Sequence, residues 1–482
     1  MNSTSPFPCR NFSPLLTRRA VLSSVSCGFG WLAFSALAAR AAVDKPLAPK
    51  QPHFTPRAKR VIFLCMSGGP SHVDTFDYKP RLLADDGKPG SRPGSVWLAP
   101  KAEFKQRGKS GLWISDFFPN VAQHADDLAL IRSMQTDLPA HPQAFLRLHT
   151  GTSQFVRPSL GAWATYGLGS ENESLPGFIT IAPPNNVGGA QNYGSAFLPA
   201  IYQGTRIGSG GRFGGSQAQV KNLQPPGTPQ AQRLELDLIQ NLNREALARD
   251  PQNAEVEGVI ESFELAFKMQ SQMPAVLDLN KEGEATRKLY GVGDRDTDDF
   301  GRKCLMARRF IEAGVRFVEV GAGNWDHHFN LSAQLARNCA SVDKPIAGLL
   351  TDLKQRGLLK DTLVIWGGEF GRTPYAQGND GRDHNNKGFT LWLAGGGAKG
   401  GTSYGATDEH GAEAVQDKVA IHDLHATILH LFGIDHVRLT YRFQGRDYRL
   451  TDIHGEVVKD IDRKSTRLNS SHEWISRMPS SA

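Results

Sequence analysis

The stretch that decides the fold is residues 361–397, with the sequence DTLVIWGGEFGRTPYAQGNDGRDHNNKGFTLWLAGGG. Its two apolar runs, Thr362–Trp366 and Phe389–Ala394, are rich in β-branched and aromatic residues and are bounded by glycines. Such runs are typical of buried strands, and we expect both in a parallel sheet. The loop between them carries several polar side chains, namely Glu369, Arg372, Asp383, His384 and Asn385. Because open α/β sheets place ligands at the carboxyl ends of their strands, this loop is a candidate ligand-binding site. The alternative is a solvated loop whose carboxylates and arginine only pair with one another.

The rest of the chain alternates strand and helix patterns. The predicted strands are Arg60–Met66, Asp127–Arg132, Phe178–Ala182 and Arg316–Val320, and the predicted helices are Asp299–Ala313, Asn330–Gln355 and Leu424–Leu431. This alternation predicts an α/β fold with a mainly parallel central sheet.

Two segments interrupt the alternation. Residues 183–227 are rich in Gly, Pro and Asn and are far longer than an ordinary connection, so we expect a cover loop there. In residues 229–290, Leu234, Leu238 and Leu242 recur at four-residue spacing, which predicts a helical insertion beside the sheet.

The amino terminus has the features of a signal peptide. Arg18 and Arg19 precede a mildly apolar run, and an Ala-x-Ala cleavage pattern ends at Ala41. Adjacent arginines at this place resemble a twin-arginine signal; a membrane anchor is the alternative, but serines and glycines weaken the run. We therefore predict a signal at 1–41, a linker at 42–56 and a main α/β domain at 57–458. The mature protein should be periplasmic or extracellular, with no transmembrane segment.

The carboxyl terminus breaks the pattern. After Asp462 the sequence becomes polar and irregular and resembles translated adapter read-through, and we predict that residues 459–482 form a non-native or disordered tail. The formal net charge of +7 is concentrated in the two ends, through Arg10, Arg18, Arg19, Arg40, Arg463, Lys464, Arg467 and Arg477 against Glu473. The central region is therefore close to neutral, which argues against nucleic acid as a partner. Its three cysteines, Cys65, Cys304 and Cys339, have no metal-like spacing.

Four separate segments combine carboxylate and imidazole groups. They are His72/Asp74/Asp77, Asp326/His327/His328, Glu369/Asp383/His384 and His422/Asp423/His425. Oxygen ligands mixed with imidazole suit Zn, Mn or Mg, and carboxylates gathered at one sheet edge would repel one another without a cation. The alternative is that each His is a structural hydrogen-bonding group and each Asp a cap, which is how we interpret Asp423, as the N-cap of the late helix.

Three motifs resemble those of sulfatases and the wider alkaline phosphatase superfamily. TLVIWGGEFG (362–371) resembles their TLVIFTSDHG-type signature, HPQAFLRLHTG (141–151) their nucleophile stretch CxPSRAxLLTG, and DLHATILHLFGI (423–434) their late DIxPTLLxLAGI helix. A closer resemblance is to the bacterial family catalogued as domain of unknown function 1501, which is treated as a relative of sulfatases. It is carried over residues 57–456 by GGPSHVDTFDYKP, PSLGAWATYGLG, NWDHH, GEFGRTP and GRDHN. The resemblance implies an alkaline-phosphatase-like sandwich with helices on both faces of the sheet.

The chain departs from the sulfatase pattern at decisive positions. His141 stands where the nucleophilic Cys or Ser is expected, and Glu369 and Phe370 stand at the metal-binding Asp and His. Gly68 and Gly69 replace the paired Asp residues after the first strand. A formylglycine mechanism is therefore excluded, which leaves another nucleophile, such as Ser71, or an activated water.

Together these features predict an exported metal-dependent hydrolase of phosphate or sulfate esters. The substrate would be a small-molecule or polysaccharide ester, and the cofactor a divalent ion, Zn, Mn, Mg or Ca. The expected metal ligands are Asp74, Asp326, His328, Glu369, His384 and His425. His141 would be the general acid or base, Arg372 would meet the substrate anion, and Ser71 is a candidate nucleophile. The alternative is a catalytically inactive relative that acts as a binding or accessory protein of the cell envelope.

Overall fold

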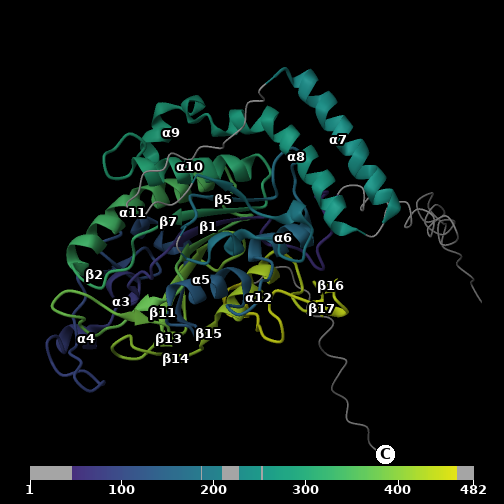
Figure 1. Cartoon of the computed structure of the whole chain (residues 1–482). Coiled ribbons are helices and arrows are strands. Elements are labelled where there is room, and N and C mark those ends of the chain that lie inside the picture. The colour runs from purple at the N-terminus through teal and green to yellow at the C-terminus, as the bar shows by residue number, and fades with distance from the viewer. Residues whose placement is uncertain (1–45, 186, 209–226, 251–252, 464–482) are drawn as a thin grey trace, which may run out of the picture.

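The computed structural model describes residues 46–185, 187–208, 227–250 and 253–463 (Figure 1). The predicted signal peptide, residues 209–226 of the predicted cover loop and residues 464–482 of the predicted tail lie outside the described residues. In the part of the chain that the structure covers, no helix combines the length and apolar character needed to cross a membrane.

Nine strands form one central sheet within these ranges. Its order is β12 (Thr402–Tyr404), β4 (Leu128–Gln135), β11 (Phe389–Ala394), β8 (Thr362–Gly367), β1 (Arg60–Met66), β7 (Phe317–Ala322), β5 (Phe178–Ile181) and β6 (Thr205–Ile207), and β15 (Val419–Ala420) pairs with β4. All pairings are parallel except those of β11. The predicted α/β class with a mainly parallel central sheet is confirmed.

The orientation predicted for the second apolar run is wrong. β11 lies antiparallel to β8, with Trp392 opposite Trp366, and antiparallel to β4 on its other side. A parallel neighbour would need a crossover of a dozen or more residues, usually a helix, whereas residues 368–388 contain only loops and two short strands. The chain therefore returns beside β8 in the opposite direction.

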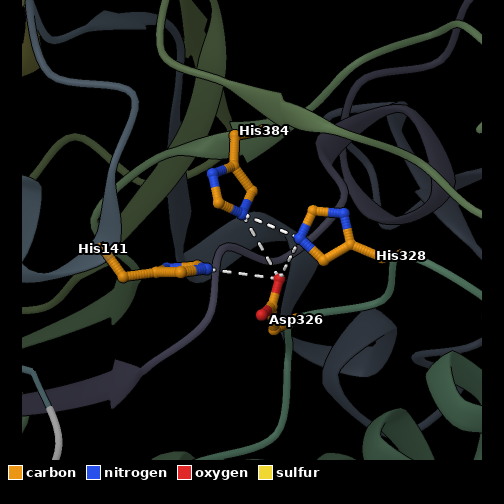
Figure 2. A group of neighbouring side chains, drawn as sticks. All are labelled: His141, Asp326, His328 and His384. Atoms are coloured by element: carbon orange, nitrogen blue, oxygen red, sulfur yellow. Dashed lines mark hydrogen bonds and ion pairs between the residues drawn. The ribbon is translucent and has the colours of Figure 1, made fainter.

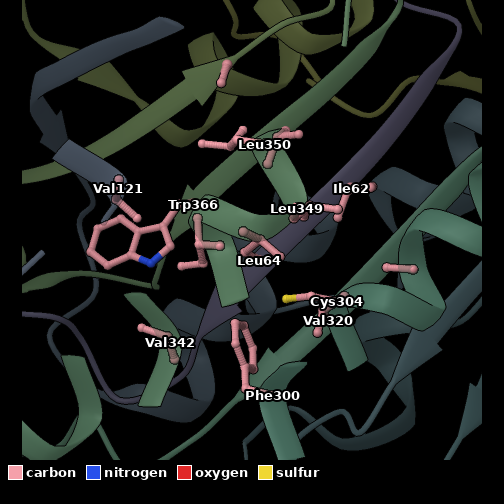
Figure 3. Packing of buried hydrophobic residues seen from close by; sticks show 14 of the residues in the cluster. Ile62, Leu64, Val121, Phe300, Cys304, Val320, Val342, Leu349, Leu350 and Trp366 are labelled. Atoms are coloured by element: carbon pink, nitrogen blue, oxygen red, sulfur yellow. The ribbon is translucent and has the colours of Figure 1, made fainter. Parts of the chain in front are cut away.

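Helices cover both faces of the sheet (Figure 1). α10 (Asp298–Glu312) and α11 (Leu331–Gln355) contribute to one core, and α5 (His141–Thr150), α6 (Leu160–Leu168) and α12 (Ile421–Leu431) to the other. Alternate side chains of β1 enter the two cores because successive strand residues point to opposite faces. Ile62, Leu64 and Met66 join the first core, and Val61, Phe63 and Cys65 join the second. Figure 3 shows Ile62 and Leu64 packed among residues of α10, α11 and β7.

The insertion at 229–290 is helical, as predicted. It consists of α7 (Pro229–Arg249), α8 (Ala254–Leu277), the 3-10 turn Leu279–Lys281 and α9 (Glu284–Leu289). α7 and α8 form a hairpin at one end of the molecule (Figure 1). Leu234, Leu238 and Leu242 are exposed on α7, so their spacing marks a helix without burying these three side chains.

The remaining elements are short. They are α3 (His72–Thr75), α4 (Pro80–Ala84), the hairpin β2 (Phe104–Arg107) and β3 (Leu112–Ser115), the pair β9 (Gly371–Arg372) and β10 (His384–Asn385), the pair β13 (Ala406–Thr407) and β14 (Ala414–Gln416), the hairpin β16 (Tyr441–Phe443) and β17 (Arg446–Tyr448), and the 3-10 turns Val121–Asp127, Gly189–Tyr193, Ala200–Tyr202 and Lys459–Ile461.

The start of the late helix and the start of the tail differ from the predictions. α12 begins at Ile421 with Ala420 as its N-cap, so Asp423 lies in the first turn and accepts a 2.9 Å hydrogen bond from the backbone N–H of Ala420. It stabilises the helix start, but not from the N-cap position that we predicted. At the carboxyl end, Ile461 is buried and its carbonyl accepts from Lys399 N at 2.8 Å. Residues 459–463 therefore pack on the domain, and the predicted start of the tail at 459 is too early.

Candidate metal centre

Four side chains from three separate loops meet at one edge of the sheet (Figure 2). Asp326 and His328 lie in the loop after β7, His384 begins β10 in the loop after β8, and His141 is the first residue of α5, which follows β4. β7 and β8 both run parallel to β1, and β4 has the same direction because both β4 and β8 oppose β11. Their carboxyl ends therefore share one edge, and the loops that leave it converge.

The three imidazoles point their Nε2 atoms at one oxygen. Nε2 of His328, His141 and His384 lies 2.9, 3.2 and 3.4 Å, respectively, from Oδ1 of Asp326. The Nε2 atoms of His328 and His384 are 3.0 Å apart. A tetrahedral zinc site with metal–ligand distances of about 2.0–2.1 Å has ligand–ligand edges of about 3.3 Å. The four ligand atoms thus have the spacing of a metal coordination sphere.

The outer nitrogen of each imidazole faces a hydrogen-bond acceptor. Nδ1 of His141 is 2.6 Å from Glu369 Oε1, Nδ1 of His328 is 2.6 Å from Gln377 Oε1, and Nδ1 of His384 is 2.7 Å from the carbonyl of Pro139. An acceptor at Nδ1 holds a proton there, so Nε2 of each ring is directed inward, and in the neutral ring that Nε2 carries the lone pair. This arrangement of outer acceptors is typical of histidines that bind metal.

The charges around His141 and Asp326 reinforce one another. Burial alone would lower the pKa of His141, but its interactions with Asp326 and Glu369 outweigh burial and raise that pKa to about 9. Burial alone would raise the pKa of Asp326, but the contacts with His141 and His384 and the charge of Arg372 hold it well below its usual range. In the absence of a cation the cluster is therefore an anionic carboxylate beside a protonated imidazole.

One side of the cluster is open to solvent. The Asp326 side chain is 45% exposed, whereas those of His141 and His384 are 16% and 19% exposed. A small ligand can therefore approach from the Asp326 side without a rearrangement of the fold.

Glu369 acts on His141 instead of joining the ligand atoms. Its fully buried carboxylate accepts from the backbone N–H of Gly68 at 2.9 Å and from Nδ1 of His141. Gly68 has φ +116°, and a Cβ there would lie 2.7 Å from the backbone nitrogen of Asp326. Only glycine fits this close approach, because any Cβ at position 68 would collide with the backbone of Trp325 and Asp326. Our assignment of Glu369 as a direct ligand is not supported by this geometry, and His141 joins the candidate ligand atoms.

Arg372 is not placed to receive a substrate anion. Its guanidinium is fully buried and donates to the carbonyls of Gly68, Gly69 and Arg382 and, at 2.5 Å, to Oδ1 of Asp326. It therefore neutralises and positions Asp326, and the expectation that it meets substrate does not match this geometry.

Asp74 and Ser71 lie in a different, closed cluster. Asp74 forms a fully buried ion pair with Arg382, at 2.8 Å from its Nε, and accepts from Lys101 N at 2.8 Å. The buried hydroxyl of Ser71 donates to the same carboxylate. Both carboxylate oxygens of Asp74 already accept hydrogen bonds, so Asp74 is not available as a metal ligand. Ser71 is fully buried and therefore lacks the exposure that a nucleophile needs.

His425 is a core residue. It is fully buried on α12, and its Nε2 donates to the carbonyl of Leu148 at 2.7 Å. Burial lowers the pKa of His425 to about 3, so the ring is neutral in the fold. Since its ring lies outside the cluster of ligand atoms, our assignment of His425 as a supporting ligand is wrong.

Three residues of the site were not singled out from the sequence. Arg382 forms the ion pair with Asp74. Gln377 accepts from His328, and the carbonyl of Pro139 accepts from His384. Arg382 is part of the GRDHN motif, which could have identified it. A single amide and a backbone carbonyl carry no sequence signal, so the other two could be found only in three dimensions.

The fold and the site define a mixed α/β protein with a candidate metal centre at the carboxyl edge of its sheet. The chain belongs to the family described as protein of unknown function (DUF1501), whose model matches residues 58–461. The comparison with curated proteins found no match.

Several solved structures are similar to this chain at low identity. They include the PsFucS1 sulfatase from Pseudoalteromonas sp. (12% identity, 82% of this chain and 70% of that one, TM-score 0.34) and the lipoteichoic acid synthase LtaP from Listeria monocytogenes (9%, 82% and 78%, 0.36). The alkaline phosphatase from the Antarctic bacterium TAB5 is also similar (12%, 72% and 92%, 0.30).

Proposed function

We propose that this protein is a metal-dependent hydrolase of phosphate or sulfate esters. The observation that carries the proposal is the convergence of three histidine Nε2 atoms on Oδ1 of Asp326, at 2.9–3.4 Å. The sulfatase-like motifs that surround these residues in the sequence support the reaction class.

The donor set fits a divalent cation. Nε2 of His141 is buried and makes no hydrogen bond within the part of the chain that the structure describes, although it lies 3.2 Å from Asp326. The Nε2 atoms of His328 and His384 face each other at 3.0 Å, where two lone pairs would repel. Imidazole and carboxylate suit Zn or Mn. A divalent cation held by these four residues would supply Lewis-acid chemistry toward an ester oxygen.

The residues around the ligands hold the site in its arrangement. Glu369 keeps the Nδ1 proton of His141 in place, and Arg372 fixes the carboxylate of Asp326 from the buried side. These contacts leave the exposed side of Asp326 for substrate. Preorganisation of this kind lowers the cost of stabilising charge that develops during the reaction.

Water is the nucleophile that the site favours. The groups that contact Oδ1 of Asp326 are three imidazoles and one guanidinium, so the cluster itself provides no hydroxyl or thiol. The sulfatase nucleophile position is occupied by His141, which faces the cluster. Direct attack by water on phosphorus or sulfur therefore accounts for the missing nucleophile, with no covalent enzyme intermediate.

A second candidate function is metal binding without catalysis, in an accessory protein of the cell envelope. Four protein ligands complete a tetrahedral sphere, as in structural zinc sites, whereas catalytic zinc sites keep one position open. The 45% exposure of Asp326 favours the hydrolase because it leaves an approach for a further ligand.

Hydrolysis of p-nitrophenyl phosphate and p-nitrophenyl sulfate by the full chain tests the proposal, with Zn²⁺, Mn²⁺ or chelator added. We expect metal-dependent turnover of at least one ester, and its loss in Asp326→Asn. Asp447→Asn is the matched control, because Asp447 is an exposed carboxylate in an ion pair with Arg442. Metal binding without turnover of either ester would support the accessory protein instead.

We also propose that the protein is exported by the twin-arginine route. Arg18 and Arg19 before the mildly apolar run support this proposal. A twin-arginine route would carry a folded protein with its metal already bound.

A further inference from the structure

A second cluster of metal-ligating side chains lies inside the core. Cys65 of β1, Glu319 of β7 and His149 of α5 each offer a ligand atom, and these atoms lie within 4.8 Å of one another. All three residues are buried, with Cys65 fully so, and none belongs to the centre around Asp326. In the sequence these residues are far apart, so no spacing motif reveals them.

Glu319 is the unusual member of this cluster. It lies in the middle of a central strand whose neighbours Val318 and Val320 are fully buried, and it is itself only 2% exposed. A carboxylate in such a place is costly unless an opposite charge compensates it. The nearest cationic or metal-binding atom is Nε2 of His149, at 3.2 Å from Glu319 Oε2.

His149 is oriented toward the carboxylate and the thiol. Its Nδ1 donates to the carbonyl of Phe145, one turn earlier in α5, at 2.8 Å. Its Nε2 makes no hydrogen bond of good geometry among the described residues. The same holds for the buried hydroxyl of Thr180, which is the register partner of Glu319 on β5. A buried imidazole nitrogen without a hydrogen bond therefore lies 3.2 Å from the carboxylate, as expected for ligands of one ion.

We infer that Cys65, His149 and Glu319 form a second, buried site for a thiophilic divalent cation such as Zn²⁺. Thiolate, imidazole and carboxylate are all zinc ligands, and their combination favours zinc over Mg or Ca. One thiolate and one carboxylate balance the two positive charges of the ion, so the occupied site carries no net charge into the core. Binding releases the thiol proton of Cys65 and any proton on His149 Nε2 to solvent.

The competing explanation is a metal-free ion pair between protonated His149 and Glu319. Burial works against a charged His149, but the charge of Glu319 outweighs it and raises the pKa of the ring. Such a pair would leave Cys65 as a neutral thiol, because burial and the charges of Glu319 and Glu369 raise its pKa. The two explanations differ in whether Cys65 is a metal thiolate, and this difference can be measured.

The test is cobalt loading of the full chain, followed by absorption spectroscopy. Co²⁺ replaces Zn²⁺ in tetrahedral sites, and a bound thiolate adds a sulfur-to-cobalt charge-transfer band in the near ultraviolet. The centre around Asp326 contains no cysteine, so it cannot produce this band. We expect the band in the wild type and in His328→Ala, and its loss in Cys65→Ala and Glu319→Gln.

Cys304→Ala is the matched control. Cys304 is fully buried and reduced like Cys65, but it belongs to α10 on the other face of the sheet. We expect this variant to keep the band, and elemental analysis to find two zinc equivalents in the wild type and one in Cys65→Ala. A wild-type protein that binds cobalt without the band, or a band that survives in Cys65→Ala, would overturn the inference. The inference does not depend on ester hydrolysis. A hydrolase that holds metal only at the centre around Asp326 would bind one zinc equivalent and would show no sulfur-to-cobalt band.

Discussion

Glu369 accepts a 2.6 Å hydrogen bond from Nδ1 of His141 and thereby turns Nε2 of that ring toward Asp326. The contact joins the start of α5 to the loop after β8, two segments that are 228 residues apart. The contact also changes the roles that we expected. Glu369, expected as a metal ligand, instead accepts from His141, and His141, expected as a general acid or base, joins the candidate ligand atoms. Carboxylate–histidine–metal arrangements fix the tautomer of the imidazole in this way.

Substitution of this carboxylate should weaken metal binding without loss of the fold. We expect Glu369→Gln to lower the affinity for Zn²⁺ by about 10–100-fold, because the amide holds the Nδ1 proton less firmly and lowers the basicity of the ring. Competition with a coloured chelator measures the affinity. Glu413→Gln, at an exposed carboxylate paired with Lys387, is the control. Equal zinc affinity in both variants would show that Glu369 does not act through His141.

Asp74 should be important for stability and unimportant for metal content. Asp74→Asn leaves the fully buried Arg382 without its counter-charge, and we expect a loss of about 3–5 kcal/mol in the free energy of unfolding. Urea titration measures the loss, and elemental analysis of the folded variant should find the same metal content as in the wild type. Loss of one metal equivalent in the folded variant would restore Asp74 as a ligand.

Acid should destabilise the fold partly through His425. Burial lowers its folded pKa to about 3, below the value of about 6.5 for an unfolded histidine. The neutral ring therefore contributes its full stability above about pH 6.5, and this contribution is lost as the pH falls from there toward 3. We expect His425→Gln to reduce the slope of unfolding free energy against pH between 6.5 and 4, as measured by urea titration.

Truncation should separate the packed end of the domain from the residues beyond it. A chain that ends at Val458 loses the buried Ile461, and we expect a decrease of about 2–5 kcal/mol in stability. A chain that ends at Arg463 should melt at the wild-type temperature, as the irregular sequence of 464–482 predicts. Thermal melting of both chains gives the comparison. A melting temperature below that of the wild type in the chain that ends at Arg463 would show that residues 464–482 stabilise the fold.

Export should depend on the paired arginines. Replacement of Arg18 and Arg19 by lysine should leave uncleaved precursor in the cytoplasm of a bacterial host with a twin-arginine pathway. Fractionation followed by immunoblotting measures precursor and mature protein. Mature protein outside the cytoplasm in unchanged amount would contradict this route.

The sequence predicted the central strands closely because their signal is local. Arg60–Met66 and Phe389–Ala394 are strands with the predicted ends, since each is a short apolar run between polar or glycine residues. The direction of β11 could not be predicted in the same way, because it depends on the path of the loop 368–388 through space. The hairpin of β2 and β3 was also missed, because three of the four residues of Phe104–Arg107 are polar and none of them is fully buried.

The residue types at the candidate metal centre could likewise be recognised from the sequence alone. Asp326, His328 and His384 follow strand ends, and parallel strands bring such loops to one edge, so their convergence follows from the alternation of elements. The roles of Glu369, Asp74 and His425 were decided only by tertiary contacts. Each of these side chains is fully buried, and its role is set by the nearest partner, which is His141 for Glu369, Arg382 for Asp74 and the carbonyl of Leu148 for His425. Local sequence determines which groups are available, whereas the pairing of buried charges depends on distances of a few ångströms between segments hundreds of residues apart.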